Sequence, residues 1–142
     1  MKKLMLCAAA LLLSTGAAAG DARLTSGDLL EIRTVINRQI DAFRRDDAHG
    51  AFALVSPDVQ EAFRTPERFL DVVRVSYRAV YRPAAVTFLG LTLIGSDAVQ
   101  QVQLTDRSGA VWHAYYAMQR QTDGSWRTNG CRLVHPAKSI PT

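Results

Sequence analysis

The sequence predicts an α+β domain in which N-terminal helices pack on a four-stranded antiparallel β-sheet. Helix-starting signals and a helical spacing of apolar residues fill residues 25–77. After Pro83 the apolar residues alternate instead, and hairpin turns separate the alternating stretches. Because all the helices precede all the strands, we expect a meander sheet and not alternating βαβ units.

The first predicted element is a long helix of about 20 residues. It begins after Thr25, which is followed three residues later by Asp28 in an acidic form of the capping box. Arg44 and Arg45 suit the negative C-terminal end of this helix. Its buried face is predicted from apolar residues spaced three or four apart: Leu29, Ile32, Ile36, Ile40 and Phe43.

Three shorter helices are predicted to follow. The acidic pair 46–47 ends the long helix and can cap a short one. The pairs 56–57 and 65–66 each place Ser or Thr before Pro, which is the order of an N-cap residue and the first helical position. These two pairs predict helices around residues 57–63 and 66–77.

Four strands are predicted, at residues 85–91, 98–105, 111–119 and 126–134. Residues 106–109 have the composition of a type I turn with Gly109 in the left-handed conformation, which predicts a three-residue hairpin loop. Asp123 and Gly124 have the composition of a two-residue type I′ hairpin.

These two turns predict a register for the last three strands. It sets Leu104 opposite Trp112 and Tyr116 opposite Cys131, and it places the apolar residues together, as a buried face requires. The predicted core face holds Val102, Leu104, Trp112, Ala114, Tyr116, Met118, Cys131 and Leu133. The opposite face holds Gln101, Gln103, His113, Tyr115, Gln119, Thr128 and Arg132.

The N-terminus has the pattern of a cleavable secretory signal peptide. Lys2 and Lys3 precede an apolar run at residues 4–13, which is too short to span a bilayer, and Ala17-Ala18-Ala19 gives a small-residue cleavage site. We therefore expect a signal peptide at residues 1–19, a single domain at 24–135 and a flexible tail at 136–142. The mature protein, with no membrane span, is expected in the periplasm or outside the cell.

Composition excludes several classes of function. After cleavage Cys131 is the only cysteine, so no disulfide forms within the mature chain. The histidines, His49, His113 and His135, have no metal-ligand spacing, and no metal or other cofactor is expected. The formal charge of +4 for the whole chain falls once the two leader lysines are removed. This charge is too small to indicate binding to nucleic acid.

The stretches DAFRRDDAHGAFALVSP and DGSWRTNGCRL resemble parts of the nuclear transport factor 2-like superfamily, which includes ketosteroid isomerases and polyketide cyclases. The segments FALVSPDVQEAF, RTPERF, YRPAAVTF and NGCRL resemble a small exported family with no assigned function. The resemblance covers about residues 24–134, and it implies a cone-type fold with a curved sheet. Catalytic members of the superfamily place an acidic base and tyrosine or carboxylic acid donors inside the cone.

The sequence departs from that catalytic pattern. The strand-region carboxylates, Asp97, Asp106 and Asp123, fall at strand ends and turns, so no buried carboxylate is available for proton abstraction. We therefore expect a non-catalytic domain that binds a small molecule or a protein partner. The alternatives are an isomerase or hydrolase with an unrecognised site, and a homodimeric accessory protein without a ligand.

Two sets of residues are candidates for ligand binding. The first set lies on or beside the core face and consists of Tyr116, Asn129 and Gln100. These side chains either line the mouth of a small pocket or form hydrogen bonds with the backbone of the helices. On the opposite face, Tyr115, Arg132, Gln103 and His113 belong to a partly solvated surface, a dimer interface, or a site for a small anion.

Arginines also cluster at Arg74, Arg78 and Arg82, which are interleaved with Tyr77 and Tyr81. Arg74 and Arg78 are four apart and repel mildly on one helical face. The cluster marks either an anion partner or a solvated rim in which Asp71 offsets Arg74.

Overall fold

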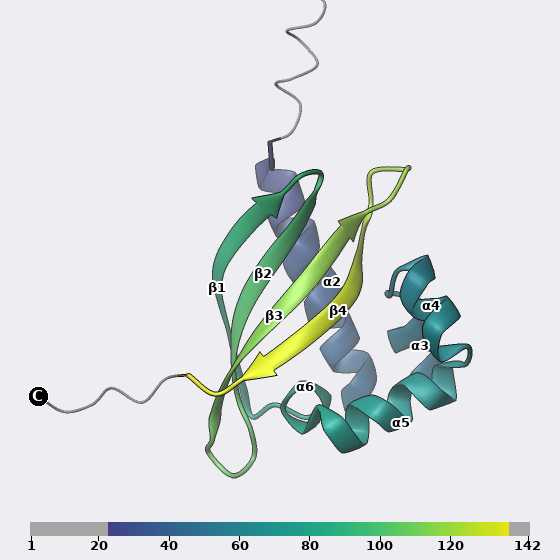
Figure 1. The fold of residues 1–142 in the computed structure, drawn as a ribbon. Coiled ribbons are helices and arrows are strands. Elements are labelled where there is room, and N and C mark those ends of the chain that lie inside the picture. Colours follow the sequence, from purple (N-terminus) through teal and green to yellow (C-terminus); the bar gives the residue numbers. More distant parts are fainter. Residues whose placement is uncertain (1–22, 137–142) are drawn as a thin grey trace, which may run out of the picture.

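The computed structural model describes residues 23–136 and has the predicted α+β class (Figure 1). The predicted signal peptide and all but the first residue of the predicted tail lie outside the described residues. The helices are α2 (Ser26–Arg44), α3 (Ala48–Phe52), α4 (Pro57–Phe63), α5 (Pro66–Ser76) and α6 (Arg78–Tyr81). The strands are β1 (Ala85–Ile94), β2 (Asp97–Thr105), β3 (Val111–Arg120) and β4 (Trp126–Val134).

The sheet has the order β1-β2-β3-β4, and every neighbouring pair is antiparallel, as predicted. It is curved and not closed, and α2 runs along one of its faces (Figure 1). Helices α3, α4, α5 and α6 gather beside the end of α2 at one side of the sheet. The strand predicted at residues 85–91 ends too early, because β1 continues to Ile94. Ile94 pairs with Asp97 across a tight turn that contains Gly95 (φ 62°).

The predicted helix starts are confirmed. Asp28 N–H donates to Thr25 Oγ1 (3.0 Å) and the Asp28 carboxylate accepts from Thr25 N–H (2.8 Å), which completes the capping box. Asp47, Ser56 and Thr65 cap α3, α4 and α5 through their side chains. The sequence did not predict α6: the chain leaves α5 at Ser76 and makes one further helical turn.

One continuous core lies between α2, the sheet and the helices at its side. The buried face of α2 follows the predicted spacing except at Leu29, which is 41% exposed. Among the predicted sheet-face residues, Trp112, Cys131 and Leu133 are only partly buried and pack at the margin. The fully buried ones are Val102, Leu104, Ala114, Tyr116 and Met118.

The turn prediction between β3 and β4 was wrong by one residue. Gln121 N–H donates to Ser125 C=O (2.8 Å) and Gly124 N–H to Gln121 C=O (2.9 Å), so residues 122–124 form a three-residue loop with Gly124 at φ 88°. A β-bulge then shifts the register between Tyr116 and Met118. The loop error and the bulge cancel, which is why Tyr116 pairs with Cys131 as predicted.

The bulge also corrects the predicted face of Thr128. Between the loop and the bulge, Thr128 pairs with Met118 and is 4% exposed, inside the core and not on the outer face. Trp126, two residues earlier, is buried on the same side. The bulge residue Gly130 has φ 138°, a conformation that side chains disfavour, so the bulge falls where the sequence supplies glycine.

Candidate functional site

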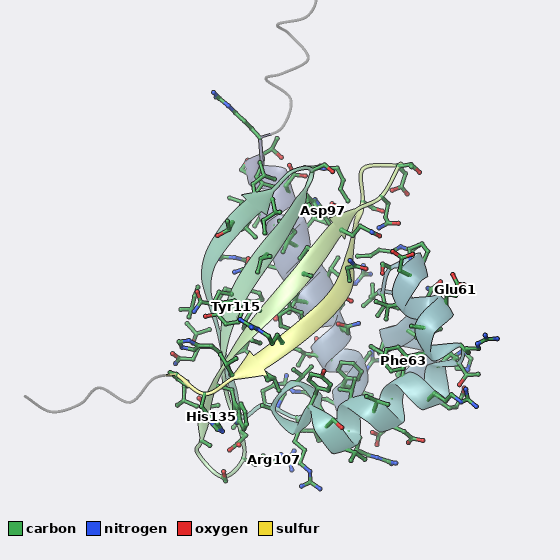
Figure 2. The ribbon with its side chains drawn as sticks, viewed as in Figure 1. Glu61, Phe63, Asp97, Arg107, Tyr115 and His135 are labelled. Atoms are coloured by element: carbon green, nitrogen blue, oxygen red, sulfur yellow. The ribbon has the colours of Figure 1, made fainter. Side chains whose placement is uncertain are left out.

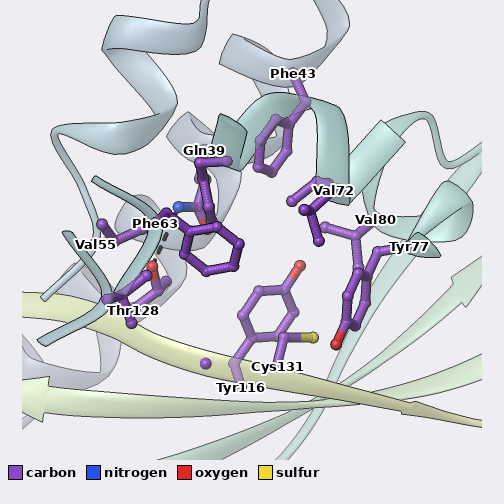
Figure 3. A pocket seen from close by; sticks show the side chains of 14 residues that line it. Gln39, Phe43, Val55, Phe63, Val72, Tyr77, Val80, Tyr116, Thr128 and Cys131 are labelled. Carbon is purple, nitrogen blue, oxygen red and sulfur yellow. Dashed lines mark hydrogen bonds between the residues drawn. The ribbon is translucent and has the colours of Figure 1, made fainter. Parts of the chain in front are cut away.

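A pocket of about 130 Å³ lies between α2, α5 and the inner face of the sheet (Figure 3). Its walls are chiefly valine and phenylalanine side chains. Phe43 comes from α2, Phe69 and Val73 come from α5, and Phe63 comes from the end of α4. Phe69 contacts both Phe43 and Phe63, with ring centroids 5.8 and 5.3 Å apart. The aromatic contacts fix one side of the pocket.

Tyr116 of β3 supplies the floor of the pocket. Its side chain is 1% exposed, and its hydroxyl points into the space between the helices and the sheet (Figure 3). Within residues 23–136 this buried hydroxyl has no hydrogen-bond partner. A buried polar group without a partner costs about 1–3 kcal/mol. The hydroxyl is therefore a donor that the described part of the chain leaves free.

Tyr116 and Cys131 are neutral at physiological pH. Burial, and to a smaller extent the neighbouring Cys131, raises the pKa of the Tyr116 phenol well above its ordinary value. Burial raises the pKa of the Cys131 thiol to about 12. The phenol therefore acts as a hydrogen-bond donor, and the thiol lacks the ionisation that a nucleophile needs.

Gln39 and Thr128 form the polar end of the pocket. Gln39 Nε2 donates to Ala51 C=O and to Thr128 Oγ1, both at 3.1 Å. Because a carbonyl only accepts, the bond to Ala51 fixes the orientation of the amide. Thr128 N–H in turn donates to Leu54 C=O (2.9 Å), which ties the segment before α4 to the edge of β4.

The β4 bulge contributes an exposed residue to the lining of the pocket. Gly130 lines the pocket, is exposed, and has no neighbouring heavy atom within 4 Å of the place where a Cβ would stand. Across from it Val72 of α5 also lines the pocket and is 38% exposed. The pocket therefore has exposed lining residues on the bulge and on α5.

Chemistry at this pocket is limited by its lining. The lining residues include no Asp, Glu, His, Lys or Arg side chain. A charged ligand group would be desolvated there without an opposite charge, which is costly. A neutral and mostly apolar molecule fits the lining best.

Of the inner-face candidates, only Tyr116 lines this pocket. Gln100 is 1% exposed, and its Nε2 donates to Leu89 C=O (3.2 Å) and Gly90 C=O (3.3 Å). Its side chain therefore provides hydrogen bonds to the backbone carbonyls of the bulge in β1. Asn129 is partly buried and its Oδ1 accepts from Ser56 Oγ (2.6 Å) at the start of α4.

The outer-face candidates are brought together on the sheet surface, away from the pocket. Tyr115 pairs with Arg132, whose guanidinium lies 5.6 Å from the Tyr115 ring centroid, and Gln103 pairs with His113. His113 Nδ1 is 3.3 Å from Gln101 Nε2. Their role in binding or dimerisation stays a prediction.

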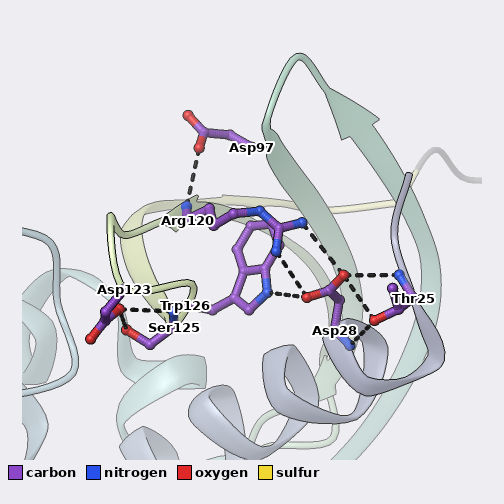
Figure 4. Close-up of polar contacts among 7 residues, drawn as sticks. All are labelled: Thr25, Asp28, Asp97, Arg120, Asp123, Ser125 and Trp126. Atoms are coloured by element: carbon purple, nitrogen blue, oxygen red, sulfur yellow. Dashed lines mark hydrogen bonds and ion pairs between the residues drawn. The ribbon is translucent and has the colours of Figure 1, made fainter. Parts of the chain in front are cut away.

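Sequence reasoning missed the contacts of Asp28 at the other end of the sheet (Figure 4). Its carboxylate accepts from Trp126 Nε1 (3.0 Å) and from Arg120 Nη1 (3.0 Å), besides Thr25. The side chain is 12% exposed, and the hydrogen bonds, that from Thr25 N–H first, hold the pKa of this carboxyl well below its usual value. Such a carboxylate stabilises the fold and is a poor proton acceptor.

Within residues 23–136, no three His, Cys, Asp or Glu side chains group so as to hold a metal ion. No helix in this range has the length and apolar character to cross a bilayer.

The fold and the pocket define the class: an α+β domain whose curved sheet and helices enclose a small apolar cavity. The chain belongs to the family described as a domain of unknown function, DUF4864, whose model matches residues 25–140. Searches of curated proteins and of solved structures give no match. The expected membership of a family without an assigned function is confirmed, and the wider superfamily stays a prediction.

Proposed function

We propose that this protein is an exported, non-catalytic binding domain. Its pocket would hold one small, neutral, mainly apolar molecule that carries a hydrogen-bond acceptor. The observation that carries the proposal is the buried Tyr116 hydroxyl, which has no partner among the described residues and points into the pocket. An acceptor on the ligand would satisfy it.

The size of the pocket supports a ligand of about one ring. An engineered apolar cavity of about 150 Å³ binds benzene, and this pocket has about 130 Å³. Water is a poorer occupant because a buried water makes about three hydrogen bonds. The valine and phenylalanine side chains that make up most of the lining offer none, and Gln39 and Thr128 already bond to each other.

Two finer assignments belong to the same proposal. The open, curved sheet with helices at its mouth, and a tyrosine aimed into the enclosed space, support membership of the nuclear transport factor 2-like superfamily. The N-terminal pattern of Lys2, Lys3, an apolar run and Ala17-Ala18-Ala19 supports export to the periplasm or the medium. A non-catalytic role is supported by the lining within residues 23–136, where no side chain is a carboxylate or an imidazole.

The test compares acetophenone with ethylbenzene, which have similar size and differ in a carbonyl oxygen. Both are titrated into the purified protein and into Tyr116→Phe, and binding is followed by the chemical shifts of pocket residues. We expect both probes to bind the wild type. The variant should lose about fivefold in affinity for acetophenone, the value of one hydrogen bond of about 1 kcal/mol, and nothing for ethylbenzene.

Stability serves as the control for this variant. Without a probe, Tyr116→Phe should unfold at equal or higher denaturant concentration, because the substitution removes an unpaired buried hydroxyl. A clear loss of stability would mean that the hydroxyl already has a partner. If neither probe shifts the pocket resonances of the wild type, the proposal is wrong.

A further inference from the structure

A basic groove is lined by residues of α5, of α6 and of the turn between β2 and β3. It has a volume of about 640 Å³ and shares no lining residue with the apolar pocket. Arg74 comes from α5, Arg78 and Arg82 lie in and after α6, and Arg107 stands on the turn between β2 and β3. Figure 2 shows Arg107 at the end of the molecule where this turn and α6 meet.

The groove carries an excess of positive charge. Arg74 pairs with Asp71 (2.7 Å) and Arg82 with Asp46 (3.0 Å), whereas Arg78 and Arg107 have no carboxylate within 4 Å in residues 23–136. The sequence spacing of Arg74 and Arg78 predicted repulsion along one helix. The structure instead ends α5 at Ser76 and turns Arg78 toward the β2–β3 loop.

Asp106, the one carboxylate that lines the groove, is engaged within its own turn. Its Oδ1 accepts from the N–H groups of Ser108 (2.9 Å) and Ala110 (3.0 Å), and its Oδ2 accepts from Trp112 Nε1 (3.0 Å). Within the described residues it makes no ion pair with an arginine. It shapes the wall of the groove and does not pair with Arg78 or Arg107.

Arg82 is a fixed part of this wall. Its Nη2 donates to Asp46 Oδ2 and to the Tyr81 hydroxyl (3.2 Å), which holds the guanidinium in place. Its Nε is buried and has no hydrogen-bond partner in residues 23–136. Asp46 and Tyr81 thus hold the Arg82 guanidinium in the groove that Arg78 and Arg107 also line.

We propose that this groove binds a phosphate-type oxyanion carried on a larger molecule. Guanidinium groups match phosphate in planar, two-point hydrogen bonds. A phosphate monoester has a charge of about −1.5 to −2 and three acceptor oxygens, enough for several arginines at once. A single carboxylate offers fewer acceptors, and the groove is larger than a bare ion needs. Soluble phosphate esters and phospholipid headgroups share this chemistry.

The test measures affinity by calorimetric titration of the purified protein with inorganic phosphate and with glycerol 3-phosphate, at constant ionic strength set with sodium chloride. The variant Arg78→Ala/Arg107→Ala should bind either probe at least tenfold more weakly. The variant Arg78→Lys/Arg107→Lys keeps the charge, and its affinity should lie between those of the wild type and of the alanine variant. The matched control, Arg38→Ala/Arg68→Ala, removes two exposed arginines outside the groove and should bind as the wild type does.

Vesicles separate the two sources of phosphate. Co-sedimentation with phosphatidylglycerol but not phosphatidylcholine vesicles, lost in Arg78→Ala/Arg107→Ala, would assign a lipid headgroup. Binding of glycerol 3-phosphate without vesicle binding would assign a soluble ester. The proposal is overturned if neither probe nor vesicles bind, or if the groove variant and the control lose affinity equally. Circular dichroism of each variant checks that it is folded.

Discussion

Asp28 joins three distant parts of the chain through one carboxylate. It caps α2 with Thr25, receives the indole N–H of Trp126, and forms an ion pair with Arg120 that is largely shielded from water. The Arg120 guanidinium also stacks on the Trp126 ring at 4.4 Å. These contacts hold the start of the first helix against the last hairpin.

We expect Asp28→Asn to lower the free energy of unfolding by about 1.5–3 kcal/mol at pH 7, the range for hydrogen bonds to a charged group. The folded pKa of Asp28 lies below its unfolded value of about 3.9. Its stabilising contribution is therefore complete above that unfolded value and is lost as the pH falls below it toward the folded pKa. Urea denaturation between pH 2 and 7 measures this.

The control for this prediction is Glu61→Gln, at an exposed position of α4 with no hydrogen bond or ion pair in the described structure. It should leave both the stability and its acid dependence close to wild type. If Asp28→Asn shows the same loss of stability between pH 5 and 2 as the wild type, Asp28 is not the group responsible.

At the residue scale, the sequence predicted the local contacts of Asp28 and missed the distant ones. The capping box depends on spacing alone, so Thr25 and Asp28 were enough to predict it. The bonds from Trp126 and Arg120 span more than ninety residues. They arise only when the sheet is assembled, and no local pattern encodes them. The same is true of the unpaired Tyr116 hydroxyl, which periodicity placed on the core face without showing that it lacked a partner.

At the element scale, the bulge in β4 decides which residues face the pocket. Without it, the three-residue loop at 122–124 would carry Cys131 to the other face, because a shift of one residue exchanges the two faces of a strand. The sequence contained the signal in Gly130, a glycine within a strand. Asp123-Gly124 fits both loop lengths, so composition did not distinguish a long loop with a bulge from a short loop without one.

Replacement of Gly130 by alanine should lower the free energy of unfolding by about 1–3 kcal/mol, because its φ of 138° is a region that a Cβ disfavours. No neighbouring atom obstructs the Cβ, so the cost is conformational. The matched control is Gly90→Ala in the β1 bulge, where the space is also open and φ is not in that region. Equal effects of the two substitutions in urea denaturation would contradict this interpretation.

At the scale of the whole molecule, stability is distributed unevenly between the two sides of the pocket. Helix α2 and the sheet provide most of the core, whereas α4 contains no buried residue. Helix α4 is held at its start by Ser56, which donates to Asn129 and, through its N–H, to Thr128 C=O (2.8 Å). Val59 and Phe63 of α4 nevertheless line the pocket. The least buried helix thus forms one of its walls.

We expect the amides of α4 to exchange hydrogen faster than those in the middle of α2, because local opening follows from low burial. Hydrogen–deuterium exchange with mass spectrometry measures both segments in one experiment. Binding of acetophenone should slow exchange in α4 more than in β1, which does not line the pocket. Equal protection of α4 and α2 in the unliganded protein would show that the pocket wall is rigid.

The sheet order predicted from the chain was right because each strand pairs with its neighbour in sequence, and hairpin turns are local signals. The position of the pocket was not predictable in the same way. It depends on how far α5 stands from β3 and β4, and on the chain between 76 and 85, where α6 was missed. The arginines of the basic groove were visible as a cluster, but Arg107 joined them only through the tertiary fold.

The contact between Asp28 and Trp126 joins the first-made and last-made parts of the described domain. A chain made from its N-terminus produces α2 about a hundred residues before the strand that its first turn must hold. Until β4 emerges, the apolar face of α2 has only part of its sheet, and the β3–β4 hairpin that locks its start does not exist. The native contacts at the start of α2 are therefore completed only after the last hairpin of the domain has been made.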